Sequence, residues 1–320
     1  MVQVKKLPKL TPRKKNTHKG SYGRVLVLAG SPGMTGAAYL CSKAALRSGS
    51  GIVTLGIPES LNPVMETKLT CVMTYPLPET KASTLSNKGR KAILKLCESH
   101  DVVALGPGLS QQPETRELIL WLIKNIDCAM VIDADGLNTL ADNVNVLHKI
   151  KQNVVLTPHP GEMSRLTGLR SARKNELDRQ LINATVCFVP SCYSMDVCKE
   201  RLNAATQFVQ SIQKKLKGER KLVLVLKGDK TVVTDYKKVY VNSTGNPGMA
   251  TAGVGDVLTG IIVSLVGQGF DVFDASQLGV YIHGLAGDIA AKKKGELSMI
   301  ASDIIDYLPD AFMKYKKERK

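Results

Sequence analysis

Short apolar runs alternate with longer amphipathic stretches through most of this chain. The first apolar run, R-V-L-V-L-A at residues 24–29, leads into the glycine-rich residues 30–36 and a small-residue stretch over 37–47. A second apolar run follows at residues 51–57. Strand, glycine loop, helix and strand make a βαβ unit, which needs two parallel strands. The pattern predicts an α/β fold with a mostly parallel central sheet.

Each later apolar run ends in a glycine or polar cluster. We predict further strands at residues 102–105, 130–132, 154–156 and 222–226, followed by clusters at residues 106–108, 133–136, 157–162 and 227–231. In an open parallel sheet the carboxyl ends of the strands share one edge, and ligands bind there. These clusters are therefore expected to line one site.

No internal repeat or linker divides the chain, so we predict a single domain over residues 18–316. The remaining regular elements are predicted as helices at residues 87–97, 114–124, 201–216, 274–293 and 302–316 and an antiparallel segment at 231–241. The alternation breaks over residues 171–199, which we interpret as an inserted surface segment. Residues 1–17 and 317–320 are predicted to be basic tails.

The stretch N-P-G-M-A-T-A-G-V-G-D-V-L-T-G, residues 246–260, is the main candidate for chemistry. It predicts a loop of small residues that becomes an apolar helix, with Gly253, Val254 and Gly255 at the junction. The free N–H groups and the dipole of a helix start attract anions. Asp256 in the first turn is then placed to act as a general base beside a bound phosphate. An Asp in a first turn can also simply complement the dipole, but an unpaired acid on so apolar a helix would be costly to bury.

Three other features have competing interpretations. The loop over residues 30–36 does not match G-x-G-x-x-G, so we do not predict a dinucleotide-binding Rossmann loop. Asp133 and Asp135 could form a metal pair or cap the helix that follows them. His159, held between two prolines, could present its ring to a ligand or bond locally in a turn. We predict no metal ligands in the protein itself, and we expect Mg²⁺ to arrive with a nucleotide.

The net charge of +16 does not by itself indicate nucleic-acid binding. Eight basic residues and no acid stand in residues 1–24, and five more basic residues with one Glu stand in residues 314–320. Charge gathered at the two ends is typical of solvated tails, and 5% aromatic residues leave few platforms for bases. We expect neither a nucleic-acid partner nor a membrane partner. The basic N-terminus is either a plain tail or a targeting segment, and seven cysteines without C-x-x-C favour a reduced, cytoplasmic setting.

Several motifs occur in one order along the chain and together resemble a known family. They are H-K-G-S-Y-G at 18–23, A-G-S and G-A-A within 29–38, G-P-G-L at 106–109, L-T-P-H-P-G-E at 156–162, L-K-G at 226–228 and N-P-G-M-A-T-A-G-V-G-D at 246–256. The set resembles the ADP- or ATP-dependent (S)-NAD(P)H-hydrate dehydratases of the ribokinase-like superfamily, in their bacterial-type branch. The resemblance implies a three-layer α/β/α ribokinase-like fold. It also implies a repair reaction, in which hydrated NADH or NADPH is phosphorylated on its ring hydroxyl and then loses phosphate.

The resemblance assigns roles to particular residues. Asp256 would be the catalytic base, and Gly253, Val254 and Gly255 would form the anion hole. The nucleotide would contact Lys227, Gly228, Asp229, Lys230, Thr231, Asn246, Pro247, Gly248, Met249, Ala250, Thr251, Ala252, Gly253, Val254 and Gly255. The hydrated dinucleotide would contact Ala37, Gly108, His159, Pro160, Gly161, Glu162 and Asp256. The co-substrate would be ADP or ATP with Mg²⁺, and the choice of donor stays open.

Two other functions compete with this one. A vitamin-precursor or sugar kinase of the same superfamily would share Asp256 and the glycine loop, whereas P-H-P-G-E and G-A-A favour the dehydratase. A nucleotide-binding module without catalysis would have no use for Asp256. We also expect a homo-oligomer, and a separate NAD(P)H-hydrate epimerase as pathway partner, because no epimerase domain precedes the first motif.

Overall fold

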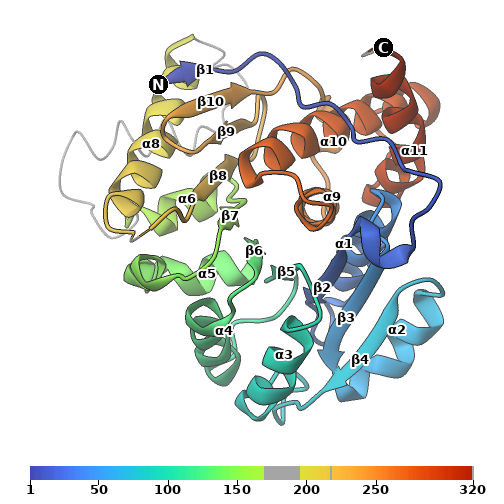
Figure 1. Ribbon diagram of the computed structural model, residues 1–320, viewed down its shortest axis with the longest axis vertical. Coiled ribbons are helices and arrows are strands. Elements are labelled where there is room, and N and C mark those ends of the chain that lie inside the picture. Colours follow the sequence, from blue (N-terminus) through green and yellow to red (C-terminus); the bar gives the residue numbers. More distant parts are fainter. Residues whose placement is uncertain (169–194, 217, 319–320) are drawn as a thin grey trace.

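One mostly parallel sheet runs through the protein, with helices on both of its faces (Figure 1). The computed structural model describes residues 1–168, 195–216 and 218–318. The described strands are β1 (Val2–Gln3), β2 (Arg24–Leu28), β3 (Ile52–Pro58), β4 (Met73–Leu77), β5 (Val102–Leu105), β6 (Ala129–Ile132), β7 (Val154–Leu156), β8 (Leu222–Leu226), β9 (Val232–Thr234) and β10 (Lys238–Val241). Their order is β1-β10-β9-β8-β7-β6-β5-β2-β3-β4, and only β9 runs antiparallel to its neighbours.

The helices form the two outer layers. They are α1 (Thr35–Arg47), α2 (Asn62–Lys68), α3 (Arg90–Cys97), α4 (Pro113–Asn125), α5 (Asp135–Ala141), α6 (Pro160–Leu166), α8 (Met195–Gln213), α9 (Val254–Gly267), α10 (Val272–Lys294) and α11 (Ala301–Glu318). One core lies between the sheet and α1, α2, α9, α10 and α11, and the other between the sheet and α3, α4, α5, α6 and α8.

Alternation along each strand divides the apolar residues between these cores. In β2, Val25 and Val27 belong to the first core, and Leu26 and Leu28 belong to the second. A strand covered on both faces must be apolar at every position, which is why these runs are continuous. The three-layer α/β/α fold and the predicted parallel strands are confirmed.

The strand order reverses beside β2, and in open α/β sheets such a reversal marks the place where ligands bind. The chain goes from β2 outward to β3 and β4, then returns to pair β5 on the other side of β2. Loops at the carboxyl ends of two strands that part in this way leave room for a ligand. The loops after β2 and β5 therefore flank the expected binding edge.

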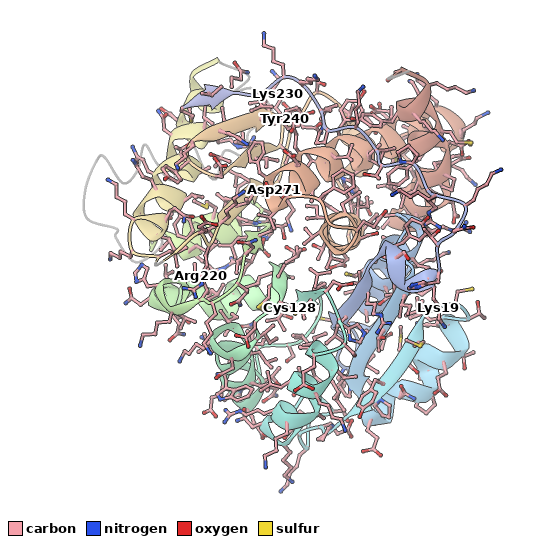
Figure 2. All side chains as sticks on the ribbon, viewed as in Figure 1. Lys19, Cys128, Arg220, Lys230, Tyr240 and Asp271 are labelled. Carbon is pink, nitrogen blue, oxygen red and sulfur yellow. The ribbon has the colours of Figure 1, made fainter. Side chains whose placement is uncertain are left out.

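The N-terminal residues do not form the free tail predicted from their charge. Val2 pairs with Lys238 of β10, Leu7 is buried, and the Pro8 carbonyl oxygen accepts a hydrogen bond from the Tyr315 hydroxyl group. The prediction considered only the charges and not the apolar residues between the lysines. The lysine side chains themselves are exposed. Basic residues also lie far apart elsewhere, as Lys19, Arg220 and Lys230 show (Figure 2).

Other boundaries also differ from the prediction. Most of the predicted insertion lies outside the described residues, but residues 195–199 belong to α8, so the insertion does not extend to 199. The predicted tail at 317–320 begins inside α11. Helix α2 and strand β4 were not predicted. Strand β4 contains Pro76 and exposes most of its residues, as edge strands do. No described helix is long and apolar enough to cross a membrane.

Candidate active site

Helix α9 begins at Gly253, which has a backbone conformation that favours glycine. Its φ is +87°, and a side chain there would also collide with Leu40 of α1. Gly253 is the N-cap residue and provides no side-chain cap. The N–H groups of Val254, Gly255 and Asp256 have no acceptor within the described part of the chain. The helix start therefore presents free donors and the positive end of its dipole.

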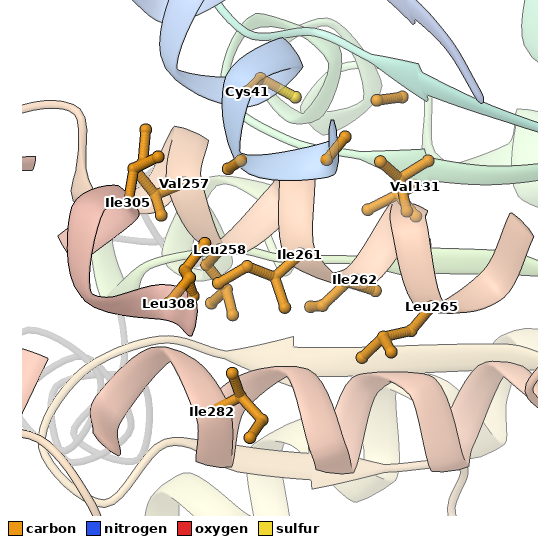
Figure 3. Close-up of a cluster of buried hydrophobic side chains, with 14 of the residues drawn as sticks. Cys41, Val131, Val257, Leu258, Ile261, Ile262, Leu265, Ile282, Ile305 and Leu308 are labelled. Atoms are coloured by element: carbon orange, nitrogen blue, oxygen red, sulfur yellow. The ribbon is translucent and has the colours of Figure 1, made fainter. Parts of the chain in front are cut away.

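The apolar faces of α9 hold this start rigidly (Figure 3). Val257, Leu258, Ile261, Ile262 and Leu265 are buried against α1, α10, α11 and the sheet, where they meet the residues Cys41, Val131, Ile282, Ile305 and Leu308. Gly260 lets α9 approach the α1 backbone near Cys41. Asp256 is thus fixed by a packed core rather than by a mobile loop.

A buried lysine stands beside the helix start. Lys227 follows β8, and its ammonium group lies 2.6 Å from Asp133 Oδ1 and 3.8 Å from Glu162 Oε2. A Cβ atom on Gly255 would lie 3.2 Å from Lys227 Nζ. Lys227 was predicted to line the nucleotide site. The structure places its ammonium group beside Gly255, the residue before Asp256. A phosphate at the helix start would meet both the free N–H groups and this cation.

Asp133 closes the cluster from the end of β6. Its side chain is 1% exposed, and its Oδ2 accepts a hydrogen bond of 2.7 Å from Thr259 Oγ1. Asp135 turns away and accepts from the Ser110 N–H group. Between the two acids, Ala134 has a φ of +47°, a conformation that costs a non-glycine residue of the order of 1 kcal/mol or more. Neither acid caps α5 through its side chain, so the capping interpretation was wrong.

Burial sets the proton affinities in this cluster. It raises the pKa of the half-buried Asp256 to about 7, with the charge of Asp133 adding to the effect and Lys227 opposing it. Burial likewise raises the pKa of Glu162 to about 7. The charge of Lys227 lowers this pKa, and the charge of Asp133 raises it further. Burial alone would lower the pKa of Lys227, but the charges of Asp133 and Glu162 outweigh it and the net direction is upward. Asp256 can therefore hold or release a proton near neutral pH, as a general base must.

His283 of α10 supports the helix start as a neutral group. Its Nε2 lies 3.1 Å from the Val254 carbonyl oxygen, so Nε2 carries the proton and donates it. Burial lowers the pKa of His283 to about 4. The anion site therefore has Lys227 rather than His283 as its charged partner.

His159 bonds locally, as one of its two interpretations required. Its Nδ1 accepts from the Gly161 N–H group at 3.0 Å and from that of Glu162 at 3.4 Å, and it caps α6. Glu162 returns a hydrogen bond by accepting from the His159 N–H group. Half of the His159 side chain stays exposed. The cap fixes the direction of the ring, and the Nε2 atom on its other edge lies 3.5 Å from Glu162 Oε1.

Ala37 of α1 and Gly108, which follows β5, lie close together. A Cβ atom on Gly108 would lie 3.2 Å from the Ala37 Cβ, and the φ of Gly108 is +62°. The Gly108 carbonyl oxygen accepts from Ser31 Oγ at 2.8 Å, and the Pro107 carbonyl accepts from the Gly30 N–H group. Two predicted substrate contacts that are far apart in sequence therefore share one wall.

The predicted nucleotide loops are held by residues that the sequence did not indicate. Arg201 of α8 donates to the carbonyl oxygens of Lys227 and Asp229. Asp288 of α10 accepts from the N–H group of Gly245 and from the Asn246 side chain. Gly228, Asp229 and Lys230 stay exposed at the end of β8. No sequence pattern could have revealed Arg201 or Asp288, because both act from the sides of helices.

The acids of the site do not form a dedicated metal cage. In the part of the chain that the structure describes, no group of three or more His, Cys, Asp or Glu side chains is placed to hold an ion. Lys227 already neutralises Asp133, and Asp135 accepts from Ser110. Mg²⁺ keeps several waters and commonly binds through substrate phosphates.

Comparison with known proteins adds a family to this geometry. A profile of the NAD(P)H-hydrate dehydratase family matches residues 25–310. The bifunctional NAD(P)H-hydrate repair enzyme Nnr of Moorella thermoacetica is 42% identical over 97% of this chain. The match covers 53% of that relative, so the chain spans about half the length of the curated relatives it matches.

Solved structures show the same architecture. The ADP/ATP-dependent NAD(P)H-hydrate dehydratase of Bacillus subtilis, co-crystallised with ATP and Mg²⁺, superposes with a TM-score of 0.73 at 28% identity. The match covers 96% of this chain and 94% of that one. A ribokinase-like superfamily protein of Enterococcus faecalis has a TM-score of 0.69 at 22% identity, over 95% and 92% of the two chains. This second likeness shows a shared fold.

Proposed function

The chain belongs to the NAD(P)H-hydrate dehydratase family, and on that basis we propose that it dehydrates (S)-configured hydrates of NADH and NADPH with ADP or ATP as phosphoryl donor. The observation that carries the proposal is the cluster at the start of α9. There a carboxyl group with a pKa of about 7 lies in the same turn as free helix N–H groups and beside a buried ammonium group. Phosphoryl transfer needs a base, an anion site and charge stabilisation together.

Asp256 acts in the first step. Its carboxylate takes the proton from the ring hydroxyl group, whose oxygen attacks the terminal phosphorus of the nucleotide. ADP then leaves as AMP, or ATP leaves as ADP. The N–H groups of Val254 and Gly255, together with Lys227, stabilise the charge on the transferred group.

The second step restores the dihydronicotinamide ring. The bond between the ring carbon and the phosphorylated oxygen breaks, inorganic phosphate departs, and a neighbouring ring carbon loses a proton to solvent as the double bond forms. The same N–H groups and Lys227 stabilise the departing phosphate. Mg²⁺ supplies charge neutralisation to the phosphates of the bound nucleotide.

Two sets of residues are proposed to bind the two substrates. Residues 227–231 and 246–255 are proposed to hold the nucleotide. Ala37, Gly108 and His159, with the adjoining residues 160–162, are proposed to hold the hydrated dinucleotide. Glu162 has its carboxylate directed at Lys227 and His159, so we propose that it acts on the substrate through them.

A direct test separates this function from an ordinary kinase. The protein is incubated with Mg²⁺, with ADP or ATP, and with hydrated NADH prepared free of NADH, while near-ultraviolet absorbance is followed. A dehydratase regenerates the dihydronicotinamide chromophore and releases inorganic phosphate at the same rate. Flat absorbance with both nucleotides, from protein shown to bind one of them, would exclude the proposal and favour a kinase. Because of its bacterial-type motif, we expect ADP to serve at least as well as ATP.

A further inference from the structure

The first step described above makes no use of Asp133, although this acid is the most deeply buried charge of the cluster. Its side chain is 1% exposed, against 17% for Lys227 and 5% for Glu162. Burying a carboxylate is unfavourable unless it is paired and hydrogen-bonded. Asp133 is both, because its two oxygens are occupied by groups from two different elements.

The two partners of Asp133 are parts of the proposed catalytic centre or its support. Oδ1 accepts from Lys227 Nζ at 2.6 Å, and Oδ2 accepts from Thr259 Oγ1 at 2.7 Å. Thr259 is three residues after Asp256 on α9, so it lies one turn further on the same side of the helix. One carboxylate thus joins the end of β6 to the cation after β8 and to the first turns of α9.

We propose that Asp133 is a positioning residue, which holds the Lys227 ammonium group beside the helix start and fixes α9 so that Asp256 remains free to act as base. This inference rests on the proposed function. Asp133 contacts neither the substrate nor the nucleotide in this scheme, and acts through Lys227 and Thr259.

The flexibility of lysine explains why such a residue is needed. A lysine side chain carries a mobile point charge on a four-carbon stem. Without Asp133, the nearest carboxylates to Lys227 would be Glu162, at 3.8 Å, and the base Asp256 itself. An ammonium group paired with Asp256 would weaken it as a proton acceptor. The φ of +47° at Ala134 directs Asp133 inward while Asp135 turns to Ser110.

The groups around Asp256 allow the effect of Asp133 to be isolated. Asp133 from β6 and Asp135 from α5 oppose the ionisation of Asp256, and Lys227 from β8 favours it. The Glu162 carboxylate of α6 lies 3.8 Å from the Lys227 ammonium group. Cys41 of α1 is a buried neutral thiol whose pKa is raised well above its usual value, by burial first and by Asp256 and Asp133 next. His283 of α10 is neutral as well. Removing the charge of Asp133 therefore makes the surroundings of Asp256 more favourable to its ionised form.

The test compares Asp133→Asn with the parent and with Asp127→Asn, a change at an exposed acid just before β6. In Asp133→Asn we expect kcat to fall about 10- to 100-fold, because Lys227 and α9 lose their anchor. The KM for nucleotide should stay within about threefold, since residues 228–231 and 246–252 are untouched. The acid limb of the kcat/KM profile should move about 0.5 to 1 pH unit lower. Asp127→Asn should change none of these quantities.

Two further measurements keep this inference separate from the proposed function. Thr259→Val removes one anchor and keeps the charge, so kcat should fall about threefold to tenfold. If Asp133→Asn does not fold, Thr259→Val tests the positioning role of Asp133 in its place. Titration of Asp256 by ¹³C NMR, assigned with Asp256→Asn, requires no turnover and should show a lower midpoint in Asp133→Asn.

The outcomes are distinct. A parent without dehydratase activity would remove the proposed function, while the NMR midpoints would still test Asp133. An unshifted midpoint in a folded Asp133→Asn, or a kcat within twofold of the active parent in that variant, would overturn the positioning role. If Asp133→Asn does not fold, a Thr259→Val variant with kcat within twofold of the parent would overturn it as well.

Discussion

Two helices of this protein begin in the same way and differ in what surrounds their first turn. α1 follows a glycine loop after β2, α9 follows a glycine loop before residue 254, and the two helices pack closely against each other. Neither has a side-chain cap, and each has a glycine as its second residue, Gly36 in α1 and Gly255 in α9. Both therefore offer free N–H groups and a close approach to a ligand.

The two helix starts differ in the charged residues around them. The first turn of α1 contains no acid, whereas α9 has Asp256 in its first turn and Lys227 beside Gly255. A glycine at a helix start gives space and a weak positive potential, which suits binding. Chemistry needs a group that changes its protonation and a cation that stabilises the product, and only the surroundings of α9 supply both within the described residues. We therefore propose that the start of α1 takes part in binding and the start of α9 in the reaction.

The largest expected effect comes from removing the base at α9. Asp256→Asn should lower kcat by about two to four orders of magnitude, the usual range for a lost general base. Nucleotide binding, measured by calorimetry, should change little, because the N–H groups and Lys227 remain. The same change at Asp274, an acid in the first turn of α10, is the control and should leave kcat unaltered. Turnover of Asp256→Asn within tenfold of the parent would remove the distinction between the two helices.

The second effect is a pH dependence that arises mainly at α9. With a pKa of about 7, Asp256 is mostly protonated in weakly acidic solution, so kcat/KM should fall about tenfold per unit below pH 7. Glu162, with a pKa of about 7, contributes to the same limb. A rate profile that is flat from pH 5.5 to 8 would contradict the assigned base.

The same pKa has a consequence for stability with the opposite sign. The folded-state pKa of Asp256 lies above its unfolded value of 3.8, so its contribution to the free energy of unfolding is present at low pH and lost as pH rises through 7. Asp256→Asn should therefore raise the melting temperature above that of the parent by more at pH 8 than at pH 5, because the contribution is fully present only below pH 3.8. An equal difference at both pH values would show that Asp256 is not perturbed.

Matched glycines at the two helix starts give the third effect. Gly255→Ala places a Cβ atom 3.2 Å from Lys227 Nζ, and displacing that cation by a few tenths of an ångström should lower kcat about tenfold. Gly36→Ala meets nothing within 4 Å, so it should keep kcat and add about 0.5–1 kcal/mol of stability through helix propensity. Steady-state kinetics and denaturant unfolding of both variants test this, and equal loss of kcat in both would contradict it.

The smallest effect is expected at the binding helix. Ala37→Leu enlarges the half-buried residue that lies against Gly108, and should raise KM for the hydrated dinucleotide about threefold to tenfold while kcat stays within twofold. The KM for nucleotide is the internal control and should not change. A lower kcat with unchanged KM would mean that this wall takes part in the reaction.

The sequence predicted the strands and the reactive helix well because their signals are local. Continuous apolar runs predict buried parallel strands, and a glycine-led apolar helix with one acid predicts an anion site. Edge elements were missed for the opposite reason. β4 is short, contains Pro76 and has exposed side chains, so no periodic pattern marks it.

The interior of the site could not be predicted, since its contacts join distant residues. Asp133 was interpreted as a metal ligand or a cap, and nothing near it in the sequence indicates Lys227 or Thr259. The resemblance assigned Lys227 to the nucleotide site, and no nearby sequence pattern indicated that its ammonium group lies close to Gly255 of α9. Neutralisation of buried charges depends on the packing of β6, β8 and α9, which only the folded chain brings together.

The pairing of β1 with β10 bears on the order in which the protein matures during synthesis. Val2 is translated well before its partner Lys238, and Tyr315, which donates a hydrogen bond to the Pro8 carbonyl oxygen, is translated later still. Until then the apolar residues Val4 and Leu7 cannot pack against the core, and such segments are open to chaperones and to aggregation. A ribosome-bound chain should therefore expose this segment to protease until α11 has emerged.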